Sequence, residues 1–177
     1  GGLPHTEVLS QGNELVVSSW DIISGDVKPG RDVLVFDDAG DHAGLQAAEL
    51  IAKAGAKVEI MTPDRAFAPE VMAMNLVPYM RSLQKRDTTF TVTWRLVSVA
   101  RDGNQLRATL GSDYGGVTRD RLVDQVVVNH GTRPLDDLFE RSVMPPPPEI
   151  QVAPLTLKSI WDSDMLIKFQ DDITGCC

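Results

Sequence analysis

The sequence has little cysteine: its 177 residues include only two, Cys176 and Cys177, adjacent at the end of the chain. Neighbouring cysteines at one end cannot cross-link a fold, so a disulfide-stabilised secreted domain is excluded and a cytoplasmic location is expected. A terminal Cys-Cys can also be a prenylation signal, but no basic segment precedes it, as such anchors usually require. A disordered tail is the preferred interpretation.

Long hydrophobic runs and basic runs are also missing. No apolar stretch approaches the roughly 18 residues that span a bilayer, and no signal-peptide pattern is present, so no membrane partner is expected. The formal net charge is −8 and no lysine- or arginine-rich run occurs, which makes nucleic acid an unlikely partner. The length and the 42% hydrophobic content suit one soluble globular domain with a real core.

The most informative stretch that is present covers residues 33–62. Residues 33–36 form a continuous apolar run, as in a buried parallel strand. A small-residue turn over 39–44 follows, then a helical pattern that ends before Gly55, then a second apolar strand over 58–61. This order predicts one βαβ unit of about 30 residues, the unit that places a pyrophosphate at its glycine-rich turn in dinucleotide-binding folds.

The turn departs from the usual dinucleotide fingerprint. Gly40 and Gly44 fit the longer G-x-G-x-x-x-G spacing, but Asp38 stands at its first glycine position. Gly40 would let a phosphate approach the backbone, Gly44 would let helix and strand pack closely, and His42 stands where a side chain at the helix start reaches a phosphate. The alternatives are that the glycines only close the turn and that His42 is simply solvated.

Three aspartates surround this turn, at positions 37, 38 and 41. Their charges repel a pyrophosphate unless a metal or an arginine intervenes. Either the phosphate is held differently here, or the nucleotide site has decayed. The spacing of the aspartates matches no calcium loop, and no metal site is predicted. Motifs for serine hydrolases, zinc proteases and P-loops are absent as well, so no catalytic residue is assigned.

The end of the second strand bears on the choice of nucleotide. NAD-binding folds place an acidic residue there to bind the ribose hydroxyls, whereas this chain has Thr62 followed by Pro63. Arg65, a little further on, would suit a 2′-phosphate and so favour NADP over NAD. A plain surface arginine is the alternative for Arg65.

The rest of the sequence completes the expected fold. A helix is expected from Pro69 to about Lys85, with a kink or break at Pro78 and with Met72 on its buried face. Strands are expected over 90–96, where apolar and polar residues alternate, and over 106–110 and 122–128. A hairpin turn is expected at 102–103. The predicted fold is α/β: a three-layer Rossmann-like domain with a parallel sheet, flanking helices and an antiparallel β-meander. Trp20 and Trp94 are expected in the core.

The predicted organisation has three parts. Residues 1–30 form a crossover segment and residues 31–140 form the Rossmann-like nucleotide domain. Residues 141–177 form a tail of unassigned structure that begins with the rigid proline run 145–148 and can include a helix near 156–169.

Three motifs resemble the nucleotide-domain region of flavin oxidoreductases of the trimethylamine dehydrogenase, N-methylproline (dimethylglycine) demethylase and 2,4-dienoyl-CoA reductase family. Residues 1–4, GGLP, resemble the end of the A-T-G-G-x-P motif. Residues 17–25, VSSWDIISG, resemble the crossover into the inserted domain, and residues 127–136, VVNHGTRPLD, resemble the crossover back. The turn at 35–40 is typical of the demethylase-like branch.

The resemblance implies the inserted NAD(P)-binding-like Rossmann domain of a larger enzyme with an FMN barrel and a split FAD- or ADP-binding domain. FMN and FAD then belong only to the intact parent enzyme, NADP or NAD is the candidate for this chain, and the isolated chain is expected to be inactive. The expected partners are the flavin domains, and an electron-transfer protein is a further candidate. The alternatives are a non-binding structural or docking domain with a degenerate site and a free-standing nucleotide sensor.

Overall fold

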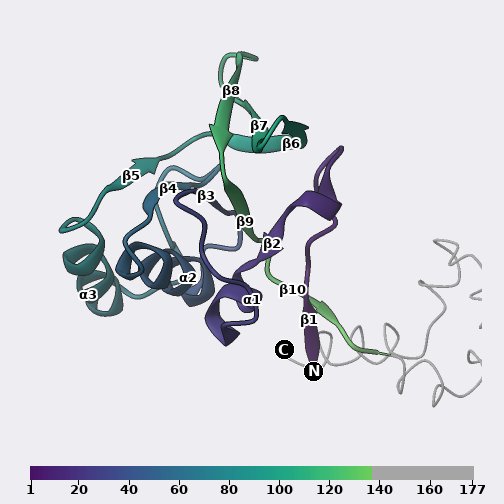
Figure 1. The fold of residues 1–177 in the computed structure, drawn as a ribbon. Coiled ribbons are helices and arrows are strands. Elements are labelled where there is room, and N and C mark those ends of the chain that lie inside the picture. The colour runs from purple at the N-terminus through teal and green to yellow at the C-terminus, as the bar shows by residue number, and fades with distance from the viewer. Residues whose placement is uncertain (137–177) are drawn as a thin grey trace, which may run out of the picture. The chain divides into compact units, whose positions relative to one another are not determined.

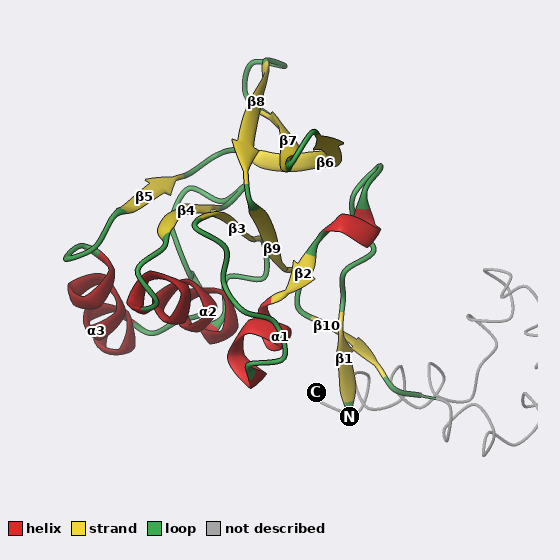
Figure 2. Cartoon of the chain, viewed as in Figure 1, coloured by secondary structure: helices red, strands yellow, loops and turns green. Residues whose placement is uncertain are grey.

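The computed structural model describes residues 1–136 (Figures 1 and 2). The proline run 145–148, the helix expected near 156–169 and the tail 141–177 lie outside the described residues. The domain boundaries given above therefore stay predictions.

A five-stranded, wholly parallel sheet forms the middle layer. Its order is β2 (Val17–Ser18), β9 (Gln125–Asn129), β3 (Asp32–Asp37), β4 (Lys57–Met61) and β5 (Thr88–Thr91). The apolar runs of β3, β4 and β9 are buried because both faces of the sheet are covered. The βαβ unit predicted over 33–62 is confirmed.

Three helices cover one face of this sheet, as Figure 1 shows: α1 (Ser19–Ser24), α2 (His42–Lys53) and α3 (Ala73–Leu83). Ser18 caps α1 through its side chain, which accepts a hydrogen bond from the Trp20 N–H. The Asp21 carboxylate in turn accepts a hydrogen bond from the Ser18 N–H. The apolar face of α2, with Leu45, Ala48 and Ile51, is fully buried on β3 and β4. Within residues 1–136, no helix is long and apolar enough to cross a membrane.

The other face carries an antiparallel meander of β6 (Arg95–Asp102), β7 (Gln105–Gly111) and β8 (Thr118–Val123). A second core lies between the two sheets and includes Leu34 and Phe36 from β3 and Leu96 and Leu110 from the meander. The turn predicted at 102–103 joins β6 to β7. The three-layer α/β prediction is confirmed.

A separate two-stranded ribbon pairs β1 (Gly2–Pro4) with β10 (Thr132–Pro134), and a short 3₁₀ turn, η1 (Asn13–Leu15), precedes β2. Figure 1 shows the ribbon projecting away from the parallel sheet.

Several local predictions were wrong. The third helix begins at Ala73 instead of Pro69, and it does not break at Pro78, whereas the alternative of a kink there stays a prediction. Met72 precedes that helix and is 74% exposed, so it does not fill the core. Trp20 is 40% exposed and lines a surface hollow with Pro4, so it is not part of the core.

Two predicted strands are each divided between sheets. The stretch 90–96 belongs to β5 of the parallel sheet and β6 of the meander, and Thr93 between them has φ of 64°. The stretch 122–128 is divided at Asp124 between β8 and β9. The strand-like pattern of the sequence continues across both boundaries, and such a pattern does not indicate where a chain leaves one sheet for another.

A charged network joins the parallel sheet to the meander. Glu59 of β4 accepts hydrogen bonds from Thr91 Oγ1 at 2.8 Å and from Arg121 Nε of β8 at 3.0 Å. Arg121 also reaches Asp32 of β3 at 2.7 Å, and Arg119 stacks over the Trp94 ring at 4.1 Å. Glu59 is 9% exposed, so these hydrogen bonds replace most of the water that its carboxylate would otherwise bind.

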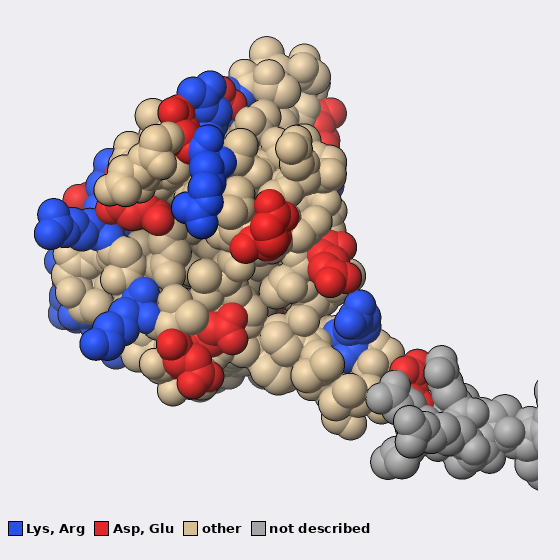
Figure 3. Space-filling view, turned by 45° about the vertical axis from the view of Figure 1, so that its right-hand side comes forward, with Lys and Arg blue, Asp and Glu red and all other residues tan. Residues whose placement is uncertain are grey.

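Charged side chains of both signs are interspersed on the face drawn in Figure 3. The expectation of no nucleic-acid partner stays a prediction.

We expect Glu59→Ala to lower the free energy of unfolding by about 2 kcal/mol, because it removes one of the two carboxylate partners of the partly buried Arg121 guanidinium. Chemical denaturation measures the change, and a double-mutant cycle with Arg121→Ala isolates the pair. The control is Glu7→Ala, which removes the exposed pair with Arg133 at 3.6 Å and should cost at most about 0.5 kcal/mol. Equal effects of the two substitutions would contradict a structural role for Glu59.

Candidate functional site

The candidate site lies at the carboxyl edge of the parallel sheet, where the turn between β3 and α2 meets the end of β9. Dinucleotide-binding folds hold their pyrophosphate at this position, against the amino-terminal end of the helix. The turn therefore has to offer free backbone N–H groups and space if it binds a nucleotide.

Asp37, the last residue of β3, fills the space beneath the turn. Its carboxylate is buried and accepts hydrogen bonds from the Gly40 N–H at 3.0 Å and from Asn129 Nδ2 at 2.8 Å. A Cβ atom at position 44 would lie 2.4 Å from Asp37 Oδ2, so only glycine fits there. Gly44 thus makes room for a carboxylate of the chain itself.

Burial raises the pKa of Asp37 to about 6. The hydrogen bonds from Asn129 and Gly40 oppose this increase, while the charges of Asp41 and Asp38 add to it. The carboxyl group therefore changes its charge near neutral pH.

Asp41 occupies the amino-terminal end of α2. Its Oδ1 accepts hydrogen bonds from the Ala43 N–H and from Asn129 Nδ2, both at 2.9 Å. The N–H groups of Asp38 and Ala39 both donate to the Asn129 carbonyl oxygen at 3.2 Å. The N–H groups of Asp38, Ala39 and Ala43 are thus bound by the chain's own oxygens.

Asp38 points to the other side and pairs with His130, with 2.9 Å between Oδ1 and Nδ1. The His130 side chain is buried and packs edge-on against Phe36. Among the described residues, its Nε2 has no hydrogen-bond partner. His130 therefore fixes the Asp38 carboxylate beside the turn.

The structure brings Asp38, Gly40, His42 and Gly44 together around this turn. Gly40 has φ of 67°, and a Cβ there would lie 2.6 Å from Pro69 Cδ, so glycine is required by the turn itself. His42 is exposed at the start of α2, and its Nδ1 lies 3.4 Å from the Tyr79 hydroxyl. Whether these residues bind a cofactor stays a prediction.

Thr62 and Arg65 follow β4 instead. Thr62 is buried, and its Oγ1 accepts the Asp64 N–H at 3.2 Å, so the hydroxyl serves the loop. Arg65 is exposed, and a hydrogen bond to the Tyr114 hydroxyl raises its pKa further above its usual range. Arg65 is thus the more accessible of the two for an anionic group.

Sequence reasoning missed Asn129 and Ser19. Asn129 donates to both Asp37 and Asp41, and its Oδ1 accepts the Ser19 hydroxyl at 3.0 Å. The only signal was an amide at the end of an apolar strand, and the partners are about 90 or more positions away in the sequence.

The side chains around the β3–α2 turn mainly hold the turn closed through hydrogen bonds within the chain. Within residues 1–136, no group of three or more histidine, cysteine or acidic side chains is arranged to hold a metal ion. A pyrophosphate at the α2 turn would compete with Asp41 for the helix donors and meet further negative charge from Asp37 and Asp38. The residues present therefore do not fit the pyrophosphate of NAD(P)H in this conformation.

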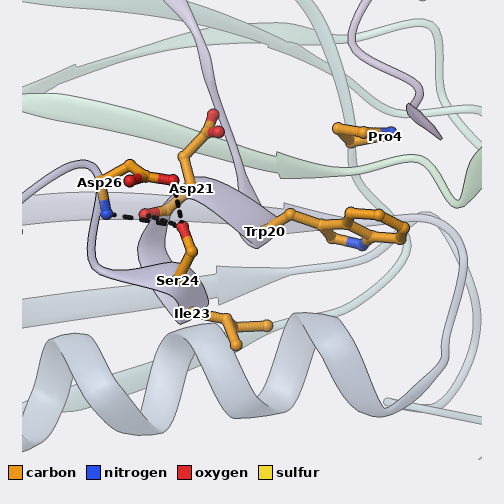
Figure 4. A pocket seen from close by; sticks show the side chains of 6 residues that line it. All are labelled: Pro4, Trp20, Asp21, Ile23, Ser24 and Asp26. Atoms are coloured by element: carbon orange, nitrogen blue, oxygen red, sulfur yellow. Dashed lines mark hydrogen bonds between the residues drawn. The ribbon is translucent and has the colours of Figure 1, made fainter.

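A second hollow lies away from this turn, beside α1. Figure 4 shows its lining: Pro4 of β1, and Trp20, Asp21, Ile23, Ser24 and Asp26 of α1 and the turn after it. Its volume is about 460 Å³, and its surface is mainly apolar.

The raised pKa of Asp37 gives a testable pH dependence. The folded chain binds more protons than the unfolded chain between about pH 4 and pH 6, so the free energy of unfolding rises as the pH falls through this window. We expect a gain of about 1 kcal/mol between pH 7.5 and pH 5, measured by chemical denaturation. Asp37→Asn should remove this gain, whereas Asp26→Asn, at an exposed carboxylate, should keep it; identical profiles for all three proteins would contradict the assignment.

Comparison with known proteins places this geometry in context. No protein-family model matches the sequence. The chain is 76% identical over 139 residues to a probable N-methylproline demethylase of Rhizobium meliloti (strain 1021), a match that covers 78% of this chain and 20% of that protein. It is 43% identical over 125 residues to an N,N-dimethylglycine/sarcosine dehydrogenase of Chromohalobacter salexigens, covering 71% and 18%.

A solved 2-naphthoyl-CoA reductase shares the fold, with a TM-score of 0.66 and 25% identity over 79% of this chain and 20% of that one. This chain spans about a fifth of the length of the curated relatives that it matches. Together, these relatives support a flavin oxidoreductase family for the chain.

Proposed function

We propose that this chain is the inserted Rossmann-like domain of a flavin oxidoreductase of the trimethylamine dehydrogenase type, acting there as a structural domain with a closed nucleotide site. In this proposal the parent enzyme holds FMN and FAD in its other domains, which pack against this one. The names of the two curated relatives point to N-methylated amino acids as the substrate class of the parent enzyme.

The observation that carries the proposal is the position of Asp41. Its carboxylate accepts the Ala43 N–H at the amino-terminal end of α2, where a phosphate oxygen would otherwise bind. Asn129 holds the same oxygen from the β9 side. A phosphate oxygen that bound the Ala43 N–H would have to displace the Asp41 carboxylate and break both of these hydrogen bonds.

The buried Asp37 carboxylate strengthens this reasoning. It accepts the Gly40 N–H and lies against Gly44, so Gly44 makes room for it while Gly40 is required by the turn. Above pH 6 it adds a negative charge beneath the turn. The glycine pattern is thus explained without a bound phosphate.

A second candidate is an NAD(P)H- or ADP-binding domain that supports electron transfer in the parent enzyme. Arg65 favours it, because an exposed guanidinium just beyond β4 is where a 2′-phosphate of NADP would be recognised. In that case Asp38, Gly40, His42, Gly44 and Thr62 would line the rest of the site, and the Asp41 side chain would rotate away from Ala43.

Calorimetric titration with NADPH, NADH and ADP at low salt separates the two candidates. We expect no binding tighter than about 1 mM, because the Ala43 N–H is already bonded to Asp41 and three carboxylates surround the turn. Binding of NADPH in the micromolar range, lost in Arg65→Ala, would establish the second candidate and overturn the first.

The double variant Asp37→Asn/Asp41→Ala tests whether the carboxylates close the site. It removes two negative charges and frees the Ala43 N–H, so we expect it to gain ADP binding in the submillimolar range, at least about tenfold tighter than the unmodified chain. Asp21→Asn/Asp26→Ala, with the same charge change beside α1, should gain nothing. If Asp37→Asn/Asp41→Ala also fails to bind ADP, the two carboxylates are not by themselves what prevents binding.

A further inference from the structure

The β1–β10 ribbon is poorly supported by the rest of the described domain. It has three residues in each strand, and all three residues of β10 are exposed. Isolated two-stranded ribbons are marginally stable in water and need another strand or a packed face. Both strands also have one edge without a partner strand among the described residues.

Large apolar side chains are exposed along and beside this ribbon. Leu3 lies in β1, Leu135 directly follows β10, and Val8 follows β1 in the sequence; each is between 46% and 50% exposed. Trp20 is 40% exposed in the hollow that Pro4 of β1 helps to line. Aromatic side chains in such apolar hollows are typical anchors of protein interfaces.

The rim of the Trp20 hollow is acidic. Figure 4 shows the Asp21 and Asp26 carboxylates on one side of it and the Trp20 ring with Pro4 on the other. Asp26 is held by the Ser24 hydroxyl at 2.6 Å and is exposed. The hollow therefore suits an apolar side chain that is flanked by lysine or arginine.

We propose that the β1–β10 ribbon and the Trp20 hollow form one interface, covered in the intact enzyme by its flavin-binding part through an apolar segment with basic neighbours. This inference rests on the proposed function, since it requires the longer polypeptide. The curated relatives supply such a covering partner, because about four-fifths of their length lies outside the region that matches this chain.

The test uses the Rhizobium meliloti relative with its matching stretch replaced by the residues of this chain. Hydrogen exchange is compared between this chimera and the isolated 177-residue chain. We expect the amides of β1 and β10 to exchange at least about tenfold more slowly in the chimera, because a covered ribbon opens less often. If the chimera does not fold, the unmodified relative is compared with its own matching stretch expressed alone.

Substitutions identify the anchor. Trp20→Ser should lower the Tm of the chimera by about 3 °C and change that of the isolated chain by less than about 1 °C. Asp26→Lys should also lower the Tm of the chimera only. The control is Tyr114→Ser, an exposed aromatic residue in the loop between β7 and β8, which should leave both proteins unchanged.

Three results would overturn the interface: equal exchange of the ribbon in both proteins, equal loss of stability by Trp20→Ser in both, or concentration-dependent protection in the isolated chain. The last would mean that a second copy covers the face. A chimera without bound flavin would count against the proposed function instead, whereas a flavin-loaded chimera with a freely exchanging ribbon would count only against the interface.

Discussion

The carboxyl edge of this domain depends on one amide side chain. Asn129 binds the carboxylates that end β3 and begin α2, accepts the hydroxyl of Ser19 in α1, and receives two backbone N–H groups through its carbonyl oxygen. Three segments that are far apart in the sequence meet here: α1, the turn from Asp37 to Asp41, and β9. Asn129 is buried, so a polar group left without its hydrogen bond here would lower the stability of the fold.

In the proposed function, this arrangement lets a domain keep the shape of a nucleotide-binding fold while its own carboxylates occupy the turn. The strand, the tight turn, the helix and the two glycines are all present, and each has a local reason in packing or backbone conformation. Carboxylates of the chain itself take the place that the negatively charged phosphates of a nucleotide would occupy. An internal anion needs no association step, so it satisfies the helix end at all times.

The layers of the fold could be predicted from the sequence because they follow from patterns of neighbouring residues. The apolar run at 33–36 and the helical spacing after it are local signals, and the three-layer arrangement follows from their order. Trp20 and Met72 show the limit of such signals, since large apolar residues were assumed to be buried and are exposed. The division of 90–96 between two sheets depends on the turn at Thr93, where a non-glycine residue adopts positive φ because its surroundings impose it. The three aspartates were recognised as unfavourable for phosphate, but their hydrogen bonds through Asn129 depend on contacts that only the folded chain creates.

The β1–β10 ribbon has a topological consequence. The Leu135 N–H donates to the Gly1 carbonyl oxygen at 3.0 Å, so the two ends of the described domain lie one hydrogen bond apart. A domain with adjacent ends can be placed within a surface loop of a host protein without pulling apart the residues on either side of the junction. For the host protein, the inserted domain then replaces a very short loop. The entropy lost on bringing the two ends of that loop together is lost when the inserted domain folds. Such a unit can pass between enzymes during evolution while the fold of each host is preserved.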